Sequence, residues 1–497
     1  MSESMSDFRQ AGYQLMQDGL SELARVEANG IRIDIPLLAE TKTKLQEKIR
    51  TLKAALEEDR VWRIWCKRFG SKASLTSGDQ LAVVLHEEMD FEVSKLTEKG
   101  RASTDEEALQ QIDHPFVKSL LRYSKYNKAL GTFLKGIERE IVNGRLHPAF
   151  NLHTARSFRS SSDSPNFQNF PVRDKEIARI IRSLFIASSD RHVIVENDFK
   201  GIEVALSASY HKDPNFISYI TTPGKDMHRD MAAQIYMLDA EDVSKDARYG
   251  AKNKFVFPQF YGDYYITCAK ALWDWIEKGK LVGNDGKSLY SHLRRNGFHE
   301  LGICDPEQEP EAGTFEAHLK DVEHDFWNRR FQKYGKWKRD WYDLYQERGY
   351  FDLLTGFRIE GFFSRNQATN LPIQGSAFHC LLWSLIQINR QLRKYRMESL
   401  VIGQIHDSLL GDVLVSELRD YLEIVERVTT VDLRRHYDWM VVPPEIEYEI
   451  ALPGQSWYDK QEFGFKQGQF VHPNDRKKQT GDPQLFLRVM EAKNNRT

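Results

Sequence analysis

Four of the 497 residues are cysteine, and they stand far apart in the sequence, at Cys66, Cys268, Cys304 and Cys380. No two of them have the spacing of a zinc site, and scattered thiols of this kind argue against a disulfide-stabilised secreted protein. The sequence also lacks an apolar run of membrane-spanning length and a signal peptide at its start. These absences predict a soluble protein of the reducing cytoplasm, with no membrane partner.

An excess of charge of either sign is missing as well, because 70 basic residues face 72 acidic ones. The balance excludes a uniformly basic nucleic-acid-binding protein, although a basic groove within a neutral whole remains compatible with it. The length is sufficient for a large core, and we expect more than one domain or subdomain.

One stretch places a carboxylate where it can reach a cleft. The β-branched run 193–195 predicts a buried strand that ends at Asp198, and Gly201 interrupts the chain before a helical pattern begins at Ile202. A carboxylate held at the end of a rigid strand suits a hard cation such as Mg²⁺. The alternative for a single such residue is a helix cap.

A second stretch, residues 400–413, predicts two short apolar strands folded about His406 and Asp407. Two carboxylates at strand ends, brought together by the fold, could bind a metal pair that holds both oxygens of an in-line phosphoryl displacement. The pair makes the capping interpretation much weaker than it is for Asp198 alone.

Four motifs in order resemble those of family A DNA polymerases, the DNA polymerase I type. The stretch Asp198-Phe-Lys-Gly-Ile-Glu203-Val-Ala is similar to the family's Asp-Tyr-Ser-Gln-Ile-Glu-Leu-Arg, and His406-Asp407 resembles its His-Asp-Glu signature. Residues 159–173 (Arg-Ser-Ser-Ser-Asp-Ser-Pro-Asn-Phe-Gln-Asn-Phe-Pro-Val-Arg) and 370–375 (Asn-Leu-Pro-Ile-Gln-Gly) resemble two further family motifs. The similarity extends from about residue 10 to about residue 460 and is greatest to bacteriophage members.

The resemblance implies an α/β (α+β) right-hand polymerase fold, with an antiparallel palm sheet and mostly helical fingers and thumb. The expected divisions are the palm base at 1–35, the thumb at 36–150, palm at 151–212, fingers at 213–365, palm again at 366–462 and a C-terminal extension at 463–497. Within the fingers, residues 277–316 are rich in Gly, Lys, Asp and Glu and predict a loop insertion. The alternation of Ile446, Tyr448 and Ile450 predicts the last strand.

By the same resemblance, Asp198, Asp407 and the backbone carbonyl of Phe199 would bind two Mg²⁺ ions, with Mn²⁺ as the alternative. Lys252 would act as a general acid for pyrophosphate. The remaining expected nucleotide-binding residues are His228, Arg248, Phe257, Tyr261 and Glu203. The expected DNA-binding residues are Arg159, Gln168, Asn169, Asn370, Gln374 and His406.

The spacing of the nucleotide-binding helix departs from the family pattern by one residue. Counting from Lys252 reaches Val256 and Phe260, whereas counting back from Tyr261 reaches Phe257, and Pro258 lies between. Because proline removes a helical hydrogen bond, the sequence leaves open which aromatic side chains face the nucleotide.

Three other features allow two interpretations each. Lys125, Lys128 and Lys135 either meet DNA phosphates or form a solvated helix face. The aromatic residues from Trp327 to Tyr345, interleaved with basic ones, either stack on single-stranded template or, as their helical spacing favours, form a buried stripe. Ser408 stands where the family has Glu, and Glu196, on the strand of Asp198, is a candidate to replace part of that charge.

The predicted activity is template-directed DNA synthesis from a primer and dNTPs. A single-subunit RNA polymerase relative is the first alternative, which Glu203 argues against because a bulky residue there would exclude a 2′-hydroxyl. The second alternative is an inactive nucleic-acid-binding subunit. We expect no 3′→5′ exonuclease in this chain, since the residues before Ile31 are too few for another α/β domain. A separate exonuclease, a helicase and a processivity factor are the candidate partners, in a bacterial or phage-infected cell.

Overall fold

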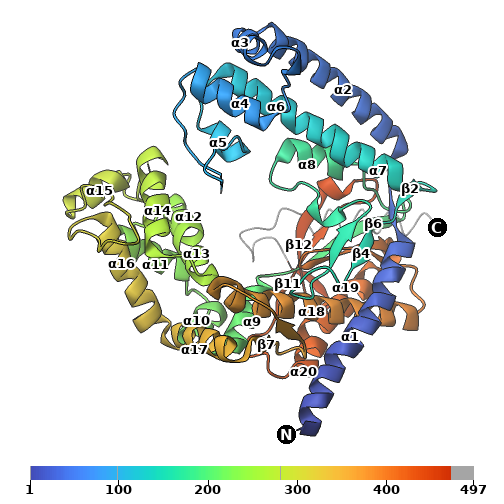
Figure 1. Ribbon diagram of the computed structural model, residues 1–497. Helices are drawn as coiled ribbons and strands as arrows, with labels where there is room; N and C mark the ends of the chain where they lie inside the picture. The colour runs from blue at the N-terminus through green and yellow to red at the C-terminus, as the bar shows by residue number, and fades with distance from the viewer. Residues whose placement is uncertain (1, 98, 280, 472–497) are drawn as a thin grey trace.

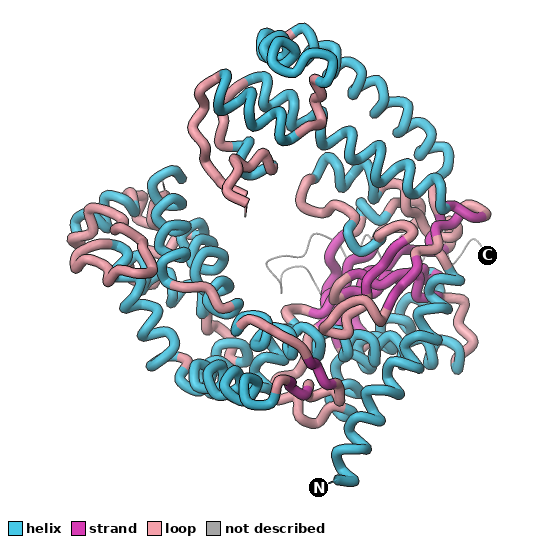
Figure 2. Tube along the Cα trace, viewed as in Figure 1, coloured by secondary structure: helices cyan, strands magenta, loops and turns pink. Residues whose placement is uncertain are grey.

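The structure is a computed structural model that describes residues 2–97, 99–279 and 281–471. A central antiparallel sheet lies between two helical arms, one formed by the N-terminal third of the chain and one by its middle (Figure 1). Figure 2 shows the strands gathered at the junction of these arms. Among the described residues, no helix is both long and apolar enough to cross a membrane.

The central sheet has six strands in the order β13-β12-β11-β6-β10-β9. Their bounds are β6 His192–Phe199, β9 Leu400–Ile405, β10 Ser408–Leu414, β11 Ile446–Ile450, β12 Gln461–Lys466 and β13 Gln469–Val471. The prediction that the strand of Ile446 is the last was wrong, because β12 and β13 extend the sheet through a turn at Gln467 and Gly468, both with positive φ. The rest of the expected extension, from residue 472, lies outside the described residues.

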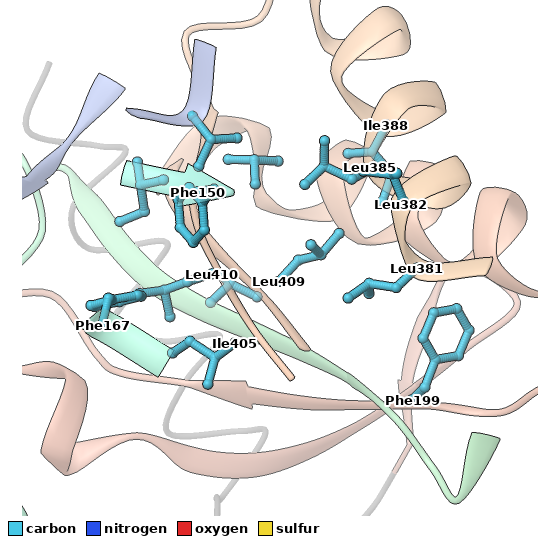
Figure 3. Packing of buried hydrophobic residues seen from close by; sticks show 14 of the residues in the cluster. Phe150, Phe167, Phe199, Leu381, Leu382, Leu385, Ile388, Ile405, Leu409 and Leu410 are labelled. Atoms are coloured by element: carbon cyan, nitrogen blue, oxygen red, sulfur yellow. The ribbon is translucent and has the colours of Figure 1, made fainter. Parts of the chain in front are cut away.

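Long helices cover one face of this sheet. They include α1 Ser2–Asn29, α18 Arg365–Lys394 and α19 Leu418–Glu426. Leu381, Leu382, Leu385 and Ile388 on α18 point toward Phe199 and Leu409 on the strands (Figure 3). Burying these side chains is the main source of stability for the sheet, and it fixes the strand ends that carry Asp198 and Asp407.

The N-terminal arm is helical and has a core of its own, which includes Trp65, Phe116 and Leu120. Its helices are α2 Ile35–Glu58, α3 Arg60–Phe69, α4 Gly78–Val83, α5 Glu106–Gln110, α6 Pro115–Lys128 and α7 Lys135–Glu140. Asp34 and His114 cap α2 and α6 by accepting backbone N–H bonds. Small strands join the arm to the sheet region: β1 Ile31–Arg32, β2 Ile141–Val142, β3 Arg145–Leu146, β4 Ala149–Asn151 and β5 Ser161–Asp163, followed by α8 Lys175–Arg182.

From β6, α9 Ile202–His211 leads into the second arm. This arm comprises α10 Pro214–Thr221, α11 Met227–Tyr236, α12 Lys245–Ala251, α13 Phe257–Tyr261, α14 Tyr265–Gly279, α15 Leu289–Arg295, α16 Phe315–Asp325 and α17 Gln332–Arg348. π-Helical turns join α12 to α13 (η5, Lys252–Val256) and follow α16 (η6, Phe326–Arg330). The expected loop at 277–316 contains α15, because Leu289 and Leu293 are buried in the core of this arm. The hairpin β7 Tyr350–Asp352 and β8 Arg358–Glu360 leads back to α18, and α20 Leu433–His436 precedes β11.

Candidate active site

Asp198 and Asp407 lie together at one end of the sheet. Asp198 is the penultimate residue of β6, and Asp407 lies in the turn between β9 and β10. In the register of β10 on β6, Ser408 stands directly opposite Asp198. The amide of Phe199 donates to the carbonyl of Asp407 at 3.2 Å. The strand pattern in the sequence therefore places both acids as expected.

The two carboxylates are short of compensating positive charge. Burial, Glu196 and Asp407 raise the pKa of Asp198 to about 7. Burial also raises the pKa of Asp407, although Arg159 and His406 oppose the shift. Oδ1 of Asp407 is buried without a hydrogen-bond partner among the described residues. Hard anionic oxygens of this kind suit a divalent cation, so the pair fits Mg²⁺.

This pair would not enclose a cation by itself. Among the described residues, no group of three or more His, Cys, Asp or Glu could hold a metal ion. Mg²⁺ characteristically binds through one or two carboxylates and completes its coordination with water and substrate phosphates. The geometry therefore suits a cation shared with a phosphate-bearing ligand.

Glu196, the candidate to replace the charge that is missing at Ser408, forms its hydrogen bonds and its ion pair with residues outside the acid pair. It accepts hydrogen bonds from Nε1 of Trp457 at 2.7 Å and from Oγ of Ser408 at 3.2 Å, and it pairs with Lys460. Burial alone would raise its pKa, but the pKa is held below its ordinary value by Lys460. The charge of Glu196 is thus balanced inside the protein.

Glu447 is the acid near Asp198 that the sequence interpretation missed. It stands directly opposite Asp198 in the register of β11 on β6, so both side chains lie on one face of the sheet. Lys200 lies 3.9 Å from Glu447 and 3.0 Å from Glu445. The alternation of Ile446, Tyr448 and Ile450 carried the signal, since it assigns Glu447 to the opposite face of that strand.

Opposite the acids lies a continuous basic helix formed by α12, η5 and α13, and η5 determines which of its side chains share one face. A π-helical turn contains one residue more than an α-helical turn, and η5 takes up the extra residue after Lys252. Nζ of Lys252 lies 5.0 Å from the centre of the Phe257 ring, and the ring of His228 lies 5.7 Å from it. Val256 is buried instead. Phe257, counted back from Tyr261, is therefore the aromatic residue on the basic face.

The basic groups on this face are held in defined states. Nε of Arg248 donates to Asp226 at 2.6 Å, and Asp226 also caps α11. Burial, together with Arg248 and Lys252, lowers the pKa of His228 to about 4, so this imidazole is neutral at pH 7. Neutral His228 can donate a hydrogen bond without adding a third full charge.

A cavity of about 210 Å³ separates the acids from the basic helix. Glu203, Phe257, Tyr261, Asn370, Gln374 and Asp407 are among its lining residues. The hydroxyl of Tyr261 donates to Oε2 of Glu203 at 3.1 Å, and Nδ2 of Asn370 donates to the carbonyl of Tyr261 at 3.0 Å. Six of the predicted site residues thus meet around one space.

A second hollow, of about 420 Å³, lies between the N-terminal arm and the sheet. Lys128, Asn169, Arg173, Arg182 and His406 are among its lining residues. Lys125 also lines this hollow, but its ammonium group pairs with Glu106 and Asp174, each at 2.9 Å. Of the basic residues weighed for phosphate contact, Lys128 is therefore better placed than Lys125.

Gln168 lines the second hollow, but its side chain is held in a buried hydrogen-bond network. Its side chain is 9% exposed and donates to Oε1 of Gln404 at 2.6 Å. Gln404, which the sequence interpretation did not single out, donates to the carbonyl of His406 at 2.7 Å. His406 has a φ of 49°, so this bond supports the strained turn that presents Asp407. Only the fold reveals this link, because nothing in the sequence pairs residue 168 with residue 404.

The aromatic residues between Trp327 and Tyr345 form mainly a buried stripe, as their spacing favours. Phe331, Tyr334 and Tyr345 are buried, and Trp327 is half-buried. The ring of Tyr334 lies 5.3 Å from Trp327 and 5.7 Å from Phe260. The stripe packs against the back of α13.

Comparison with known proteins finds similarity to one family over part of the chain. The family described as DNA polymerase family A matches residues 37–278. The chain is 28% identical over 454 residues to a thermostable DNA polymerase I of Thermus filiformis and 26% identical over 445 residues to DNA polymerase I of Geobacillus stearothermophilus. These alignments cover 90% and 88% of this chain but 48% and 44% of the relatives, so the chain spans less than half their length.

A bacteriophage protein is also similar. A DNA polymerase of Bacillus phage SP01 is 28% identical over 382 residues, which are 72% of this chain and 37% of that protein. Among solved structures, the POL domain of Pol1 from M. smegmatis, in complex with DNA primer-template and dNTP, aligns with a TM-score of 0.68 at 23% identity. The alignment covers 89% of this chain and 70% of that one, which establishes a shared polymerase-domain fold.

Proposed function

We propose that the chain is a DNA polymerase of the family A type, which extends the 3′-hydroxyl of a primer with dNTPs, directed by a template strand, and releases pyrophosphate. The observation that carries the proposal is the cavity that has Asp407 on one wall and the Phe257 face of the basic helix on the other. An acid pair and a basic helix on opposite sides of one space are what transfer of a nucleotidyl group to a hydroxyl requires.

Asp198, Asp407 and the carbonyl of Phe199 would hold two Mg²⁺ ions, for which Mn²⁺ is the alternative. When bound, these ions would supply charge neutralisation at the triphosphate and a lowered pKa of the primer hydroxyl. The chain's own contribution is orientation, since β6 and the β9–β10 turn fix both carboxylates before any ligand arrives.

Arg248 and Lys252 would bind the triphosphate oxygens by charge-assisted hydrogen bonds, and neutral His228 would donate a further one. Lys252 would transfer a proton to the departing pyrophosphate. Phe257 and Tyr261 would pack against the base and sugar, and Glu203 would occupy the space of a 2′-hydroxyl. The lining of the 210 Å³ cavity supports the roles of Glu203, Phe257 and Tyr261, and the position of Lys252 beside the Phe257 ring supports a role for the basic face.

The hollow between the N-terminal arm and the sheet would receive the primer-template duplex. Asn169 and His406 line it, and Asn370 and Gln374 line the nucleotide cavity. Arg159 lies close enough to Asp407 and Glu203 to oppose the rise in the pKa of both carboxyl groups. Gln168 would act on DNA indirectly, through Gln404 and the His406 turn. In this proposal the arms are thumb (36–150) and fingers (213–365), and the sheet region is the palm. A separate exonuclease, a helicase or a processivity factor would be partners.

The two alternatives make different demands. A related RNA polymerase would have to accept a 2′-hydroxyl beside Glu203, whose carboxylate is held by Tyr261. An inactive DNA-binding subunit would not need two acids aligned at a strand end, one of them with an unsatisfied buried oxygen. The residues present therefore support the DNA polymerase over both.

The test is extension of an end-labelled primer by wild-type protein, Asp198→Asn and Asp407→Asn, with dNTPs and then with rNTPs. We expect wild-type extension with dNTPs and Mg²⁺, and loss of nearly all extension in both variants. Primer-template affinity should be largely unchanged, because phosphate contacts dominate it. Asp438→Asn, an exposed aspartate after α20, is the matched control. Substantial extension by either active-site variant would refute the assignment.

A further inference from the structure

We infer that Lys338 is a positioning residue whose ammonium group holds the C-terminal end of α13, and with it Tyr261, in the arrangement that binds the nucleotide. The consequence for nucleotide binding depends on the proposed function, but the effect on the helix does not. Lys338 lies on α17, and no expectation from the sequence gave it a role.

The contacts of Lys338 are directed at backbone oxygens. Nζ lies 3.0 Å from the carbonyl oxygen of Gln259 and 3.4 Å from that of Phe260. These carbonyls belong to the last turn of α13, which ends at Gly262 with a φ of 94°. The final carbonyls of a helix carry partial negative charge and lack partners within the helix, so a cation there stabilises the end.

The side-chain nitrogen of Lys338 lies beside two carbonyl oxygens and the face of a ring, which can bind it in its charged or its neutral form. The side chain as a whole is half-buried, and Nζ lies 4.4 Å from the centre of the Trp327 ring. Burial, with repulsion from Arg365, lowers the pKa of Lys338 to about 7, while Glu323 opposes the shift. A methionine would fill this space without the cost of desolvating an amine. The carbonyls of α13 supply the polar partners that an enclosed amine requires.

The side chain of Gln259 makes two further contacts that hold the same turn of α13. Gln259 is 1% exposed. Its Oε1 accepts from Nε1 of Trp327 at 2.6 Å, and its Nε2 donates to Oε1 of Glu323 at 2.6 Å. One buried polar cluster thus joins α13 to α16, η6 and α17.

This polar cluster adjoins the nucleotide cavity, because Tyr261, which lines the cavity, is the residue after Phe260. Tyr261 follows Phe260, and its hydroxyl donates to Glu203 while its carbonyl accepts from Asn370. If the last turn of α13 loosens, the phenol of Tyr261 loses its fixed position over the cavity. A geometric error of this kind is expected to weaken nucleotide binding more than DNA binding.

The experiment compares Lys338→Met, Lys338→Arg and the control Lys336→Met. Lys336 lies on the same helix, is 69% exposed and pairs with Asp340. Hydrogen exchange of the amides of Phe257 and of residues 259–262, without DNA or nucleotide, measures the helix end directly; Pro258 has no amide hydrogen. We expect about tenfold faster exchange in Lys338→Met and little change in Lys338→Arg or Lys336→Met.

Steady-state kinetics then measure the consequence for the reaction. Lys338→Met should raise KM for dNTP roughly tenfold, with a smaller change in kcat and unchanged primer-template Kd. A near wild-type KM in Lys338→Arg would show that a cation at this position is sufficient, and would exclude a general packing defect as the cause of the change in Lys338→Met. This comparison remains informative if Lys338→Met folds poorly. Unchanged exchange at 257–262 would overturn the inference. If exchange is faster in Lys338→Met but the wild-type protein extends no primer, the proposed function is refuted, whereas the role of Lys338 at the end of α13 stands.

Discussion

The hydroxyl of Tyr261, at the end of α13, donates a 3.1 Å hydrogen bond to Oε2 of Glu203 at the start of α9. The bond spans the cavity wall between the helical arm and the sheet. Burial and then Asp407 raise the pKa of Glu203, and burial and then Glu203 raise the pKa of Tyr261 to about 12. Glu203 is therefore fixed in position beside the acid pair.

Replacement of Glu203 by Ala should relax selection against ribonucleotides. Removing the carboxylate opens space where a 2′-hydroxyl would lie, so relative incorporation of rNTPs should rise by at least tenfold. Paired kcat/KM measurements with dATP and ATP on one template give the ratio. Tyr261→Phe, which keeps the ring and removes only the bond, should raise the ratio less. An unchanged ratio in Glu203→Ala would place the selection elsewhere, with Phe199 as the next candidate.

Arg248→Ala should weaken use of the nucleotide. Loss of a charge-assisted contact of about 1.5–3 kcal/mol corresponds to roughly tenfold to a hundredfold in kcat/KM for dNTP. The substitution also removes the bond to Asp226, which continues to cap α11 through its backbone contact. Arg295→Ala, on the short helix α15, is the control for loss of an exposed arginine. An unchanged kcat/KM in Arg248→Ala would argue against a triphosphate at this face.

The positions of Asp198 and Asp407 could be predicted because each lies at the end of a continuous apolar run. Val193, Ile194 and Val195 on β6 and Val401 and Ile402 on β9 are all buried, so the sequence identifies both strands, although it does not specify how they pair. Glu447 was missed although Ile446, Tyr448 and Ile450 alternate, because this alternation does not show that Asp198 is the neighbour of Glu447. Pairing between β11 and β6 is a contact between distant segments, and the sequence of one strand does not contain it.

The register after Lys252 could not be predicted for a different reason. An extra residue in a helix can be absorbed by a π-helical turn, a kink or a shift of the whole helix, and these alternatives share one sequence. Packing decides among them. Val256 is buried and Phe260 packs against Phe326 and Tyr334, so the turn at η5 leaves Phe257 on the basic face. The roles of Gln404 and Lys338 were missed because each depends on a contact between distant segments: Gln168 contacts Gln404, and Lys338 contacts the carbonyl of Gln259.

Glu196→Gln should destabilise the protein, and it should also reduce the upward shift in the pKa of Asp198 to which the charge of Glu196 contributes. The substitution leaves Lys460, whose side chain is 15% exposed, with only Glu449 of its two carboxylate partners. Breaking a buried pair costs about 3–5 kcal/mol, and the remaining partner should reduce the loss to about 2 kcal/mol. Denaturant unfolding measured by tryptophan fluorescence gives the difference. Glu445→Gln, which breaks the exposed pair with Lys200, should cost less than about 1 kcal/mol, and equal losses in the two variants would contradict the prediction.

His379 should make the protein less stable in mild acid. It is buried on α18, with Nδ1 2.7 Å from Oγ1 of Thr355 and its ring stacked on Phe357. Burial lowers its pKa from an ordinary value of 6.5 to about 3. Between these values the unfolded chain binds the proton and the folded chain does not. Stability from this group is therefore complete above pH 6.5 and falls as the pH drops toward 3, by about 1.4 kcal/mol per pH unit.

The measurement is the free energy of unfolding at pH 7 and pH 5 for wild type, His379→Gln and the control His153→Gln. His379→Gln should be less stable at pH 7, because a buried contact is altered, but its loss on going to pH 5 should be smaller than that of wild type by about 2 kcal/mol. His211, which is also buried and has its pKa lowered to about 3, remains in every variant, so its contribution cancels in the comparison. His153 is exposed, and its replacement should leave the wild-type slope unchanged. Equal slopes in wild type and His379→Gln would show that this imidazole becomes protonated without unfolding of the chain around it.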